Sequence, residues 1–527
     1  MVTVMEKLVL DGGAPLDIAL KFRDTVRPNL VQQQHAWYDY AGTHYTEVEH
    51  QTIRQSVQSL LGNATRGKLL DDGTMQPLLN DEGKPIPFQP HPGDIRAAID
   101  MLGGEVHLPK DTLSPPSWLR DPPEGWSDDS AKFIIPFQNC LLDVRTRTFV
   151  SHTPDFFGTY CLPMDYDPDA KPPQIWLDFL DQIMCGRQHL IDSLVEAIGY
   201  TISQDRTLQA LFFGRGGSGS GKGTVGRVLT ALCGRNNCAF PSMSVLGEKY
   251  GLENTLDKIA IIIADLTMGK NTDTAIAAER LKNISGQDPV DVRRMAKPSF
   301  TAITLPGILW LFSNIMPNFG SATEALMRRL VCWPFDGDFR DNPDPTLSDR
   351  LCTPENLSGI MTHVLDALDR LRARGRFEQT PESMAIKQKL LGAQSTVAAF
   401  IVNRCKLDKD ARIETDVLWR AYVDYCEEVH TPPDERNWVM RNLAKAVSDT
   451  GGEIEHTRAV YRDDERKQVP GWCGIRLNDD LLPRYYQANP KLIDLDDGDL
   501  DLLGYPDRLL HPLRPHRYSD ADDFGPG

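Results

Sequence analysis

The chain has 527 residues, of which 41% are hydrophobic and 25% are charged, and its formal net charge at pH 7 is −17. This length and composition predict a soluble globular protein of more than one domain, and the acidic balance argues against a uniformly basic nucleic-acid coat while leaving room for a local basic groove. The sequence has no apolar run of about 18 residues and no secretory signal at its N-terminus, so we expect a cytoplasmic protein without a membrane partner.

Residues 1–168 are predicted to form a mixed α/β region, because many short apolar runs are broken by Pro and Gly. Within it, residues 111–129 are typical of a linker, and residues 132–152 predict two strands around a turn. Residues 169–206 are predicted to form a helical collar, because their apolar residues recur at helical spacing. These residues are Trp176, Phe179, Leu180, Ile183, Leu190, Leu194, Ile198 and Ile202.

Residues 207–340 are predicted to form a core with a phosphate-binding loop. An apolar strand at 208–213, a glycine-rich loop and an apolar-periodic helix at 225–233 follow one another, and Gly216, Gly221 and Lys222 have the Walker A spacing. The backbone N–H groups of such a loop surround phosphates, and the lysine adds a positive charge. We therefore predict ATP binding by Gly216, Gly217, Ser218, Gly219, Ser220, Gly221, Lys222, Gly223 and Thr224.

A Mg²⁺ ion is expected beside the phosphates. Gly223 stands where Ser or Thr usually follows the lysine, so the hydroxyl ligand must be Thr224 or be replaced by water. A strand at 258–264, apolar at every position after Lys258, would deliver Asp265 to the carboxyl edge of a parallel sheet, where ligands bind. Asp265 is thus the predicted catalytic acid and second metal ligand, although Ala264 stands where a tandem acid is usual.

Two further features complete the predicted catalytic site. A third apolar strand ends at Asn314, whose amide can orient an attacking water, although an ordinary turn asparagine is an equal alternative. Arg328 and Arg329 lie side by side in an apolar segment, where charges are costly unless they meet anions. One interpretation is an arginine finger that reaches a neighbouring subunit's nucleotide. The other, which we expect for one of the two, is an ion pair with acids at 336–338.

The remaining sequence predicts three segments. Residues 341–382 are expected to form a helical connector, with two prolines at its start and one apolar helix. Residues 383–477 predict a winged-helix-like domain from two helices, the first capped by Thr415 or Asp416, followed by a strand hairpin. Residues 478–527 are typical of a solvated acidic tail.

Taken in order, these motifs resemble the superfamily 3 helicases, and specifically the phage and plasmid primase-helicase C-terminal family related to the poxvirus primase-helicase. The resemblance covers roughly residues 130–340 closely. It rests on FQNCLLDV, with Cys140 where Gly is usual, and on GSGSGKGT, LKNISGQDPVDVRRMAKPSF, ITLPGILWLFSNIMP and ALMRRLVCWPF.

The resemblance implies a multidomain α/β fold whose AAA+-like P-loop ATPase forms a hexameric ring. It implies ATP and Mg²⁺ as cofactors, 3′ to 5′ movement on single-stranded DNA, forked DNA as a partner and replication of a phage or mobile element in a bacterial cytoplasm. It also implies a hairpin in the central pore, where Arg293, Arg294 and Lys297 would offer positive charge to phosphates. Residues 1–130 lack a paired-acid primase motif, so we expect a separate primase or polymerase as partner.

Two other functions are compatible with parts of the sequence. A P-loop phosphotransferase also carries a glycine loop followed by Lys-Gly-Thr, but it has no need of paired arginines that act between subunits. A nucleotide-gated DNA-binding or origin-recognition module with weak turnover is favoured by Gly223 and by the missing tandem acid.

Overall fold

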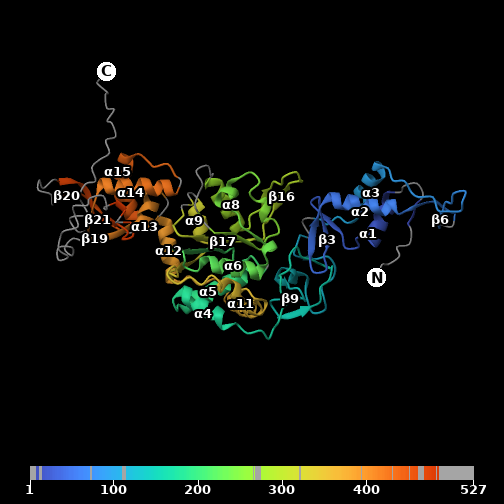
Figure 1. Cartoon of the computed structure of the whole chain (residues 1–527), viewed down its shortest axis with the longest axis horizontal. Coiled ribbons are helices and arrows are strands. Elements are labelled where there is room, and N and C mark those ends of the chain that lie inside the picture. Colours follow the sequence, from blue (N-terminus) through green and yellow to red (C-terminus); the bar gives the residue numbers. More distant parts are fainter. Residues whose placement is uncertain are drawn as a thin grey trace, which may run out of the picture.

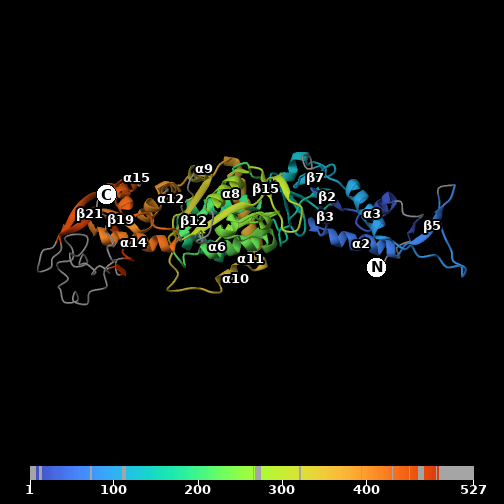
Figure 2. The same cartoon turned by 90° about the horizontal axis from the view of Figure 1, so that it is seen from above.

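The structure is a computed structural model that describes residues 8–10, 15–71, 74–109, 114–203, 205–264, 266, 274–317, 319, 322–392, 395–429, 431–449, 452–460, 468–481 and 484–485. Three bodies follow one another along the longest axis, with the N-terminal part at one end and the C-terminal helices at the other (Figures 1 and 2). The fold is multidomain α/β, as the sequence predicts. Asp265 and most of the acidic tail lie outside the described residues.

The N-terminal body contains three helices and two small sheets. Its helices pack their apolar faces together around Phe22, Ile53 and Leu102, which are fully buried. The helices are α1 (Pro15–Thr25), α2 (His50–Gly62) and α3 (Pro92–Glu105). One sheet has the order β1-β5-β6 and the other β2-β3-β4, formed by β1 (Val9–Leu10), β2 (Val31–Gln33), β3 (Ala36–Tyr40), β4 (Tyr45–Val48), β5 (Thr65–Leu69) and β6 (Met75–Pro77).

Between this body and the collar lie short strands. The prediction of two strands in residues 132–152 is wrong. This segment folds as three antiparallel strands: β8 (Ile134–Pro136), β9 (Leu141–Asp143) and β10 (Thr148–Val150). A tight turn separates the first two, in which the Phe137 N–H donates to the Cys140 carbonyl at 2.8 Å. The predicted linker contributes β7 (Ser117–Trp118), which pairs with β11 (Phe156–Phe157).

The central body is built on a five-stranded parallel sheet with the order β13-β14-β17-β12-β18. The three apolar runs predicted as buried strands form β12 (Leu211–Gly216), β14 (Ala260–Ile263) and β17 (Ile308–Ser313). The edge strands are β13 (Cys238–Ala239) and β18 (Leu330–Phe335). Because all five strands are parallel, the chain segments that follow β12, β14 and β17 emerge at one edge.

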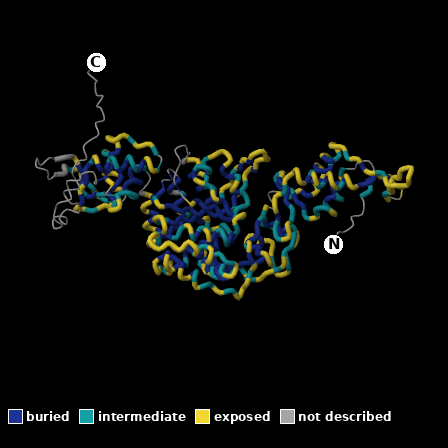
Figure 3. The backbone as a smooth tube through the Cα atoms, in the orientation of Figure 1, coloured by how far each residue is buried: buried dark blue, intermediate teal, exposed yellow. Residues whose placement is uncertain are grey.

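Both faces of this sheet are covered, which explains why its strands are apolar except at the carboxyl ends of β12 and β17. Side chains alternate between two cores: Phe213 and Leu311 belong to one, and Phe212, Trp310 and Trp333 to the other. The second core contains the collar helices α4 (Gln174–Met184) and α5 (Gln188–Ile202), together with α6 (Lys222–Cys233) and α11 (Pro354–Arg374). On the first face lie α7 (Met243–Gly247), α8 (Thr274–Gly286) and α9 (Thr323–Met327) (Figures 1 and 3).

A separate antiparallel hairpin leaves the central body between α8 and β17. It consists of β15 (Val290–Val292) and β16 (Phe300–Ile303), and its turn carries the predicted cations. The hairpin lies on the side of the central body that faces β3 of the N-terminal body (Figure 1).

The C-terminal body begins after α10 (Leu347–Leu351), α11 and α12 (Pro381–Gly392). Its elements in order are α13 (Thr396–Arg404), β19 (Cys405–Glu414), α14 (Thr415–Glu428), α15 (Arg436–Asp449), β20 (Glu455–Val460) and β21 (Gln468–Leu477). The strands form a sheet with the order β19-β21-β20. The predicted cap is wrong: Glu414 is the residue before α14, and Thr415 and Asp416 are already helical. Among the described residues, no helix is long and apolar enough to cross a membrane.

Candidate nucleotide site

The glycine-rich loop connects β12 directly to α6 at the carboxyl edge of the sheet. Gly219 and Gly221 have φ angles of 74° and 90°, a region that residues with a Cβ enter only at a cost. At Gly216 the reason for glycine is space, because a Cβ would lie 2.3 Å from the Phe335 carbonyl oxygen. The strand, loop and helix that a phosphate cradle requires are therefore all present.

Lys222 is the first residue of α6, and its ammonium group folds back over the loop. Its Nζ donates to the carbonyl oxygens of Gly216 at 2.5 Å and Gly217 at 2.6 Å and to Ser220 Oγ at 3.1 Å. These acceptors are neutral, whereas the oxygens of a phosphate are charged and form stronger charge-assisted bonds. The ammonium group therefore lies where it can exchange these neutral acceptors for the oxygens of a phosphate bound in the loop.

A cavity of about 1000 Å³ opens beside the loop and unites it with parts of the chain far away in sequence. Residues 218–224 line it, and Asn314, directly after β17, lines it as well. The structure therefore brings the predicted sensor amide to the predicted loop. Sites for small ligands usually measure about 300–1,000 Å³, so this cavity has room for a nucleoside triphosphate.

Sequence reasoning missed the apolar wall of this cavity. It is formed by α4 of the collar and by the segment after β18, through Ile175, Phe179, Phe339 and Leu347. The segment is tied to the loop because the Phe339 N–H donates to the Gly219 carbonyl at 3.0 Å. The helical period of α4 revealed a buried face but not that part of it faces a ligand cavity.

The predicted metal ligands are only partly described. The Thr224 hydroxyl accepts a hydrogen bond from Arg227 Nη2 at 3.2 Å, and Arg227 Nε donates to Ser348 Oγ at 2.7 Å. Asp265 lies outside the described residues, but its neighbour Ala264 lines a second cavity of about 540 Å³ together with Lys222 and Gly223. The end of β14 therefore approaches the loop. Hydroxyl and carboxylate oxygens are the ligands that Mg²⁺ prefers, so this donor set fits the ion.

Arg328 and Arg329 lie in different surroundings. Arg329 is half-buried, and its Nη1 donates to the Lys282 carbonyl at 3.0 Å and to Ser285 Oγ at 3.5 Å, in the last turns of α8. Arg328 is exposed at the end of α9. The anchored position of Arg329 makes Arg328 the candidate for an arginine finger.

The acids at 336–338 have other partners than the expected ones. Asp336 pairs with Arg187 at 2.8 Å and Asp338 with Arg340 at 2.6 Å. The Arg340 guanidinium holds the pKa of the Asp338 carboxyl at about 2. The described contacts of these acids therefore do not include the predicted ion pair with Arg328 or Arg329. Arg329 instead contacts the C-terminal end of α8.

The three cations predicted on the hairpin also differ from one another. Arg293 is exposed, but Arg294 is only 8% exposed, and its Nη2 donates to both carboxylate oxygens of Glu47 at 2.7 Å. Lys297 Nζ lies 3.2 Å from the same carboxylate. Glu47 belongs to β4 in the N-terminal body. An acidic side chain of the same chain therefore pairs with two of the three predicted cations, and of these two Arg294 is buried whereas Lys297 stays exposed.

Two family models match parts of the chain. A family of unknown function, DUF5906, matches residues 214–329, which include the glycine loop and both arginines. A model described as D5 N terminal like matches residues 121–185. The second match supports a relationship to the phage and viral primase-helicases, the broad group to which the sequence motifs point.

No curated protein matches. Among solved structures, the apo structure of the NrS-1 C terminal region has a TM-score of 0.41 and 10% identity, covering 88% of this chain and 99% of that chain. The A form apo structure of the same region has a TM-score of 0.40 and 9% identity over the same shares. At this score and identity, the likeness carries no inference about function.

Proposed function

We propose that this chain is an ATP-dependent DNA helicase of the superfamily 3 type, which works as a ring on single-stranded DNA in the replication of a phage or mobile element. The observation that carries the proposal is the cavity that unites the glycine loop, Asn314 and the apolar face of α4. A site that hydrolyses a nucleoside triphosphate needs a phosphate cradle, a polar side chain at the end of a neighbouring strand and an apolar wall.

The strand order supports an AAA+-like core. The loop-bearing strand β12 lies between β17 and β18, and the predicted acid-bearing strand β14 lies on the far side of β17. In the C-terminal body, the order helix, strand, helix, helix, strand, strand supports the winged-helix hypothesis, with α15 as the second helix of a helix-turn-helix pair. Both assignments go beyond what the family matches carry.

In the proposed reaction, Lys222 leaves the loop carbonyls and binds the β- and γ-phosphates, and the backbone N–H groups of residues 217–222 surround them. Mg²⁺ held by Thr224 and Asp265 would neutralise charge on the phosphates. Asn314 orients the attacking water. Arg328 of the neighbouring subunit reaches the γ-phosphate, where a finger is typically worth about 10³–10⁵ in rate.

The alternative is a nucleotide-gated DNA-binding module with weak turnover. One contact favours it: Arg227 donates to the hydroxyl that would bind Mg²⁺. If that contact persists with nucleotide bound, the ion has one protein ligand fewer and hydrolysis is slow.

ATP hydrolysis with and without single-stranded DNA, measured beside strand displacement from a forked duplex, separates the two. A helicase shows DNA-stimulated hydrolysis and unwinding, and the gated module binds ATP with little turnover. Lys222→Ala should lower kcat by at least about 100-fold, because the phosphates lose a charged ligand in the transition state. Lys249→Ala, which removes a lysine outside the cavity lining, serves as the control. If Lys222→Ala hydrolysed ATP at the wild-type rate, the glycine loop would not take part in the reaction.

A further inference from the structure

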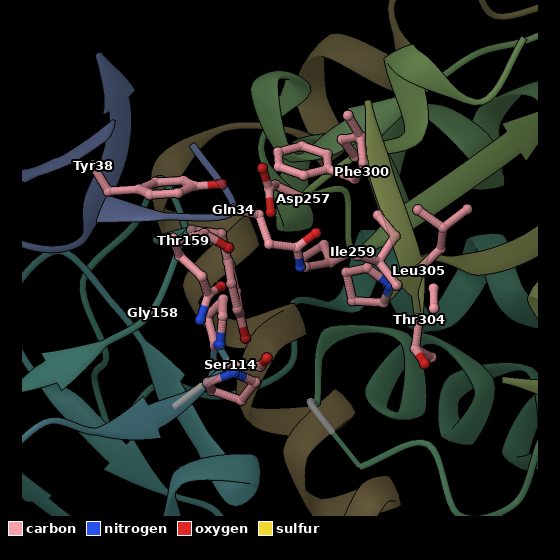
Figure 4. A pocket seen from close by; sticks show the side chains of 18 of the residues that line it. Gln34, Tyr38, Ser114, Gly158, Thr159, Asp257, Ile259, Phe300, Thr304 and Leu305 are labelled. Carbon is pink, nitrogen blue, oxygen red and sulfur yellow. The ribbon is translucent and has the colours of Figure 1, made fainter. Parts of the chain in front are cut away.

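Beneath the β15–β16 hairpin, a cavity of about 280 Å³ lies where three parts of the chain meet. The turn after β2 and strand β3 contribute Gln34 and Tyr38, the segment after β11 contributes Thr159, and the central body contributes Asp257 and Phe300 (Figure 4). Its volume is slightly below the usual lower limit of about 300 Å³ for small-ligand sites. It fits one ring system, not a whole nucleotide, and it is separate from the glycine-loop cavity.

Several residues around this cavity have positive φ, although that of Gln34 belongs to the two-residue turn between β2 and β3, which itself favours positive φ. Of the nine non-glycine residues with positive φ in the described part of the chain, three line it: Gln34 at 47°, Asp257 at 56° and Ala302 at 48°. Each such conformation costs about 1–3 kcal/mol and persists only where the surroundings enforce it, and such residues cluster at ligand sites. Apart from that turn, two independent segments are therefore held in costly conformations around one hollow.

The lining combines ring faces with hydrogen-bonding groups. Tyr38 and Phe300 bring aromatic rings to the cavity, and the side chain of Gln34 reaches between them (Figure 4). Burial, with the negative charge of Glu47 as a further cause, raises the pKa of the Asp257 carboxyl to about 6, so this group is still mostly an acceptor above pH 7. Rings that stack, together with a few polar groups that pair with an edge, are how proteins hold unstacked bases.

The cavity adjoins a second pocket at the cations of the hairpin. A neighbouring pocket is lined by Arg294 and Lys297, and it shares Tyr38, Thr159 and Asp257 with the cavity. The Arg294 guanidinium lies over the Phe300 ring at 4.7 Å from its centroid. A strand whose phosphate meets the hairpin cations therefore has a base within reach of the cavity.

We propose that this cavity holds one unstacked base of the DNA strand at the hairpin, and that guanine fits best. The Asp257 carboxylate can accept from both the N1–H and the N2–H₂ of guanine, whereas thymine offers a single N–H. The proposal rests on the proposed function only in requiring that single-stranded DNA passes the hairpin. The base site would give the protein a preference for one base, whereas the hairpin cations contact only phosphates.

The test uses the full chain, an ATP analogue and three fluorescent oligothymidylates, which carry a single central guanine, hypoxanthine or no substitution. The guanine oligonucleotide should bind about tenfold tighter than the all-thymine one, the difference that one bidentate base contact supports. Hypoxanthine, which lacks the 2-amino group, should lose most of this gain. Equal binding of the guanine and all-thymine oligonucleotides overturns the proposal.

Two variants test the residues. Asp257→Asn should bind the guanine and all-thymine oligonucleotides with equal affinity, and Phe300→Leu should weaken guanine binding. Glu279→Gln, an exposed acid on α8 outside the cavity, is the matched control. A guanine preference that survives in Asp257→Asn overturns the assignment. If no oligonucleotide binds the wild-type protein, the proposed function fails and the base site fails with it, whereas binding without base preference overturns the base site alone.

Discussion

Arg328 and Arg329 are adjacent in sequence, yet their side chains serve different purposes. Arg329 satisfies a carbonyl in the last turns of α8, where the helix leaves its acceptors unpaired and carries partial negative charge. Arg328 is exposed at the end of α9, and we propose that it acts between subunits. Sequence alone gave two equivalent candidates, and the difference comes from which of them folds back over α8.

This difference predicts opposite effects of two alanine variants. Arg329→Ala should lower the free energy of unfolding by about 1–2 kcal/mol, because a half-buried charged donor is lost and the α8 carbonyl stays unpaired. Arg328→Ala should lower ATP turnover by at least about 100-fold, a loss far larger than its effect on unfolding explains. Urea unfolding and steady-state hydrolysis, measured on both variants, check this. If Arg328→Ala hydrolysed ATP at the wild-type rate and only Arg329→Ala lost turnover, the arginine finger would be Arg329.

At the scale of elements, the hairpin and β4 form a clamp. Glu47 receives a bidentate bond from Arg294 and a further contact from Lys297, so one carboxylate occupies both cations as a phosphate would. If the hairpin binds single-stranded DNA as proposed, a phosphate must displace Glu47 from Arg294. Under that proposal the N-terminal body competes with DNA for the hairpin.

Glu47→Gln should weaken the clamp and strengthen DNA binding. A neutral amide holds the cations less well, so the affinity for an oligothymidylate should rise roughly fivefold or more, within the usual range of coupling between sites. The dependence of binding on salt should also become steeper, because more cations meet phosphates. Fluorescence anisotropy at several salt concentrations measures both. Glu49→Gln, two residues away and exposed, is the control, and equal affinities of the two variants would count against the clamp.

The sequence predicts best those elements whose pattern of apolar residues follows directly from the burial of the element itself. Strand β14, residues 211–214 of β12 and residues 308–312 of β17 are apolar at every position because helices cover both faces of the sheet, and apolar runs reveal this directly. Strand β19 was missed because its first residues are mostly charged, and only its last few are buried. A register shift between Asp408 and Arg412 further breaks its alternation.

The parts of the site that sequence missed depend on distant partners. Arg294 is buried by Glu47, which lies 247 residues earlier in the chain, and no local pattern records that pairing. The apolar wall of the glycine-loop cavity likewise comes from α4, which precedes the loop, and from Phe339, which follows β18. Motif spacing identified the loop and Asn314 because those features are local or end a strand.

At the scale of the whole molecule, the proposed mechanism requires an arginine from a second subunit. The chain supplies its own loop, sensor amide and apolar wall, but the arginine that completes the site is proposed to come from the next copy. Such a head-to-tail interface closes into a ring when the rotation allows it. Each nucleotide then sits between two subunits, and its hydrolysis is shared between them.

A mixture of two inactive variants tests this sharing. Lys222→Ala subunits keep Arg328, and Arg328→Ala subunits keep the loop, so a site formed between the two is intact. Random assembly of an equal mixture should restore about a quarter of the wild-type ATP turnover, because half the loops and half the fingers are functional in a head-to-tail ring. Mixing Arg328→Ala with the Lys222→Ala, Arg328→Ala double variant should restore nothing, because no finger is present. If the first mixture also stays inactive while it assembles normally by size-exclusion chromatography, Arg328 does not act across the interface.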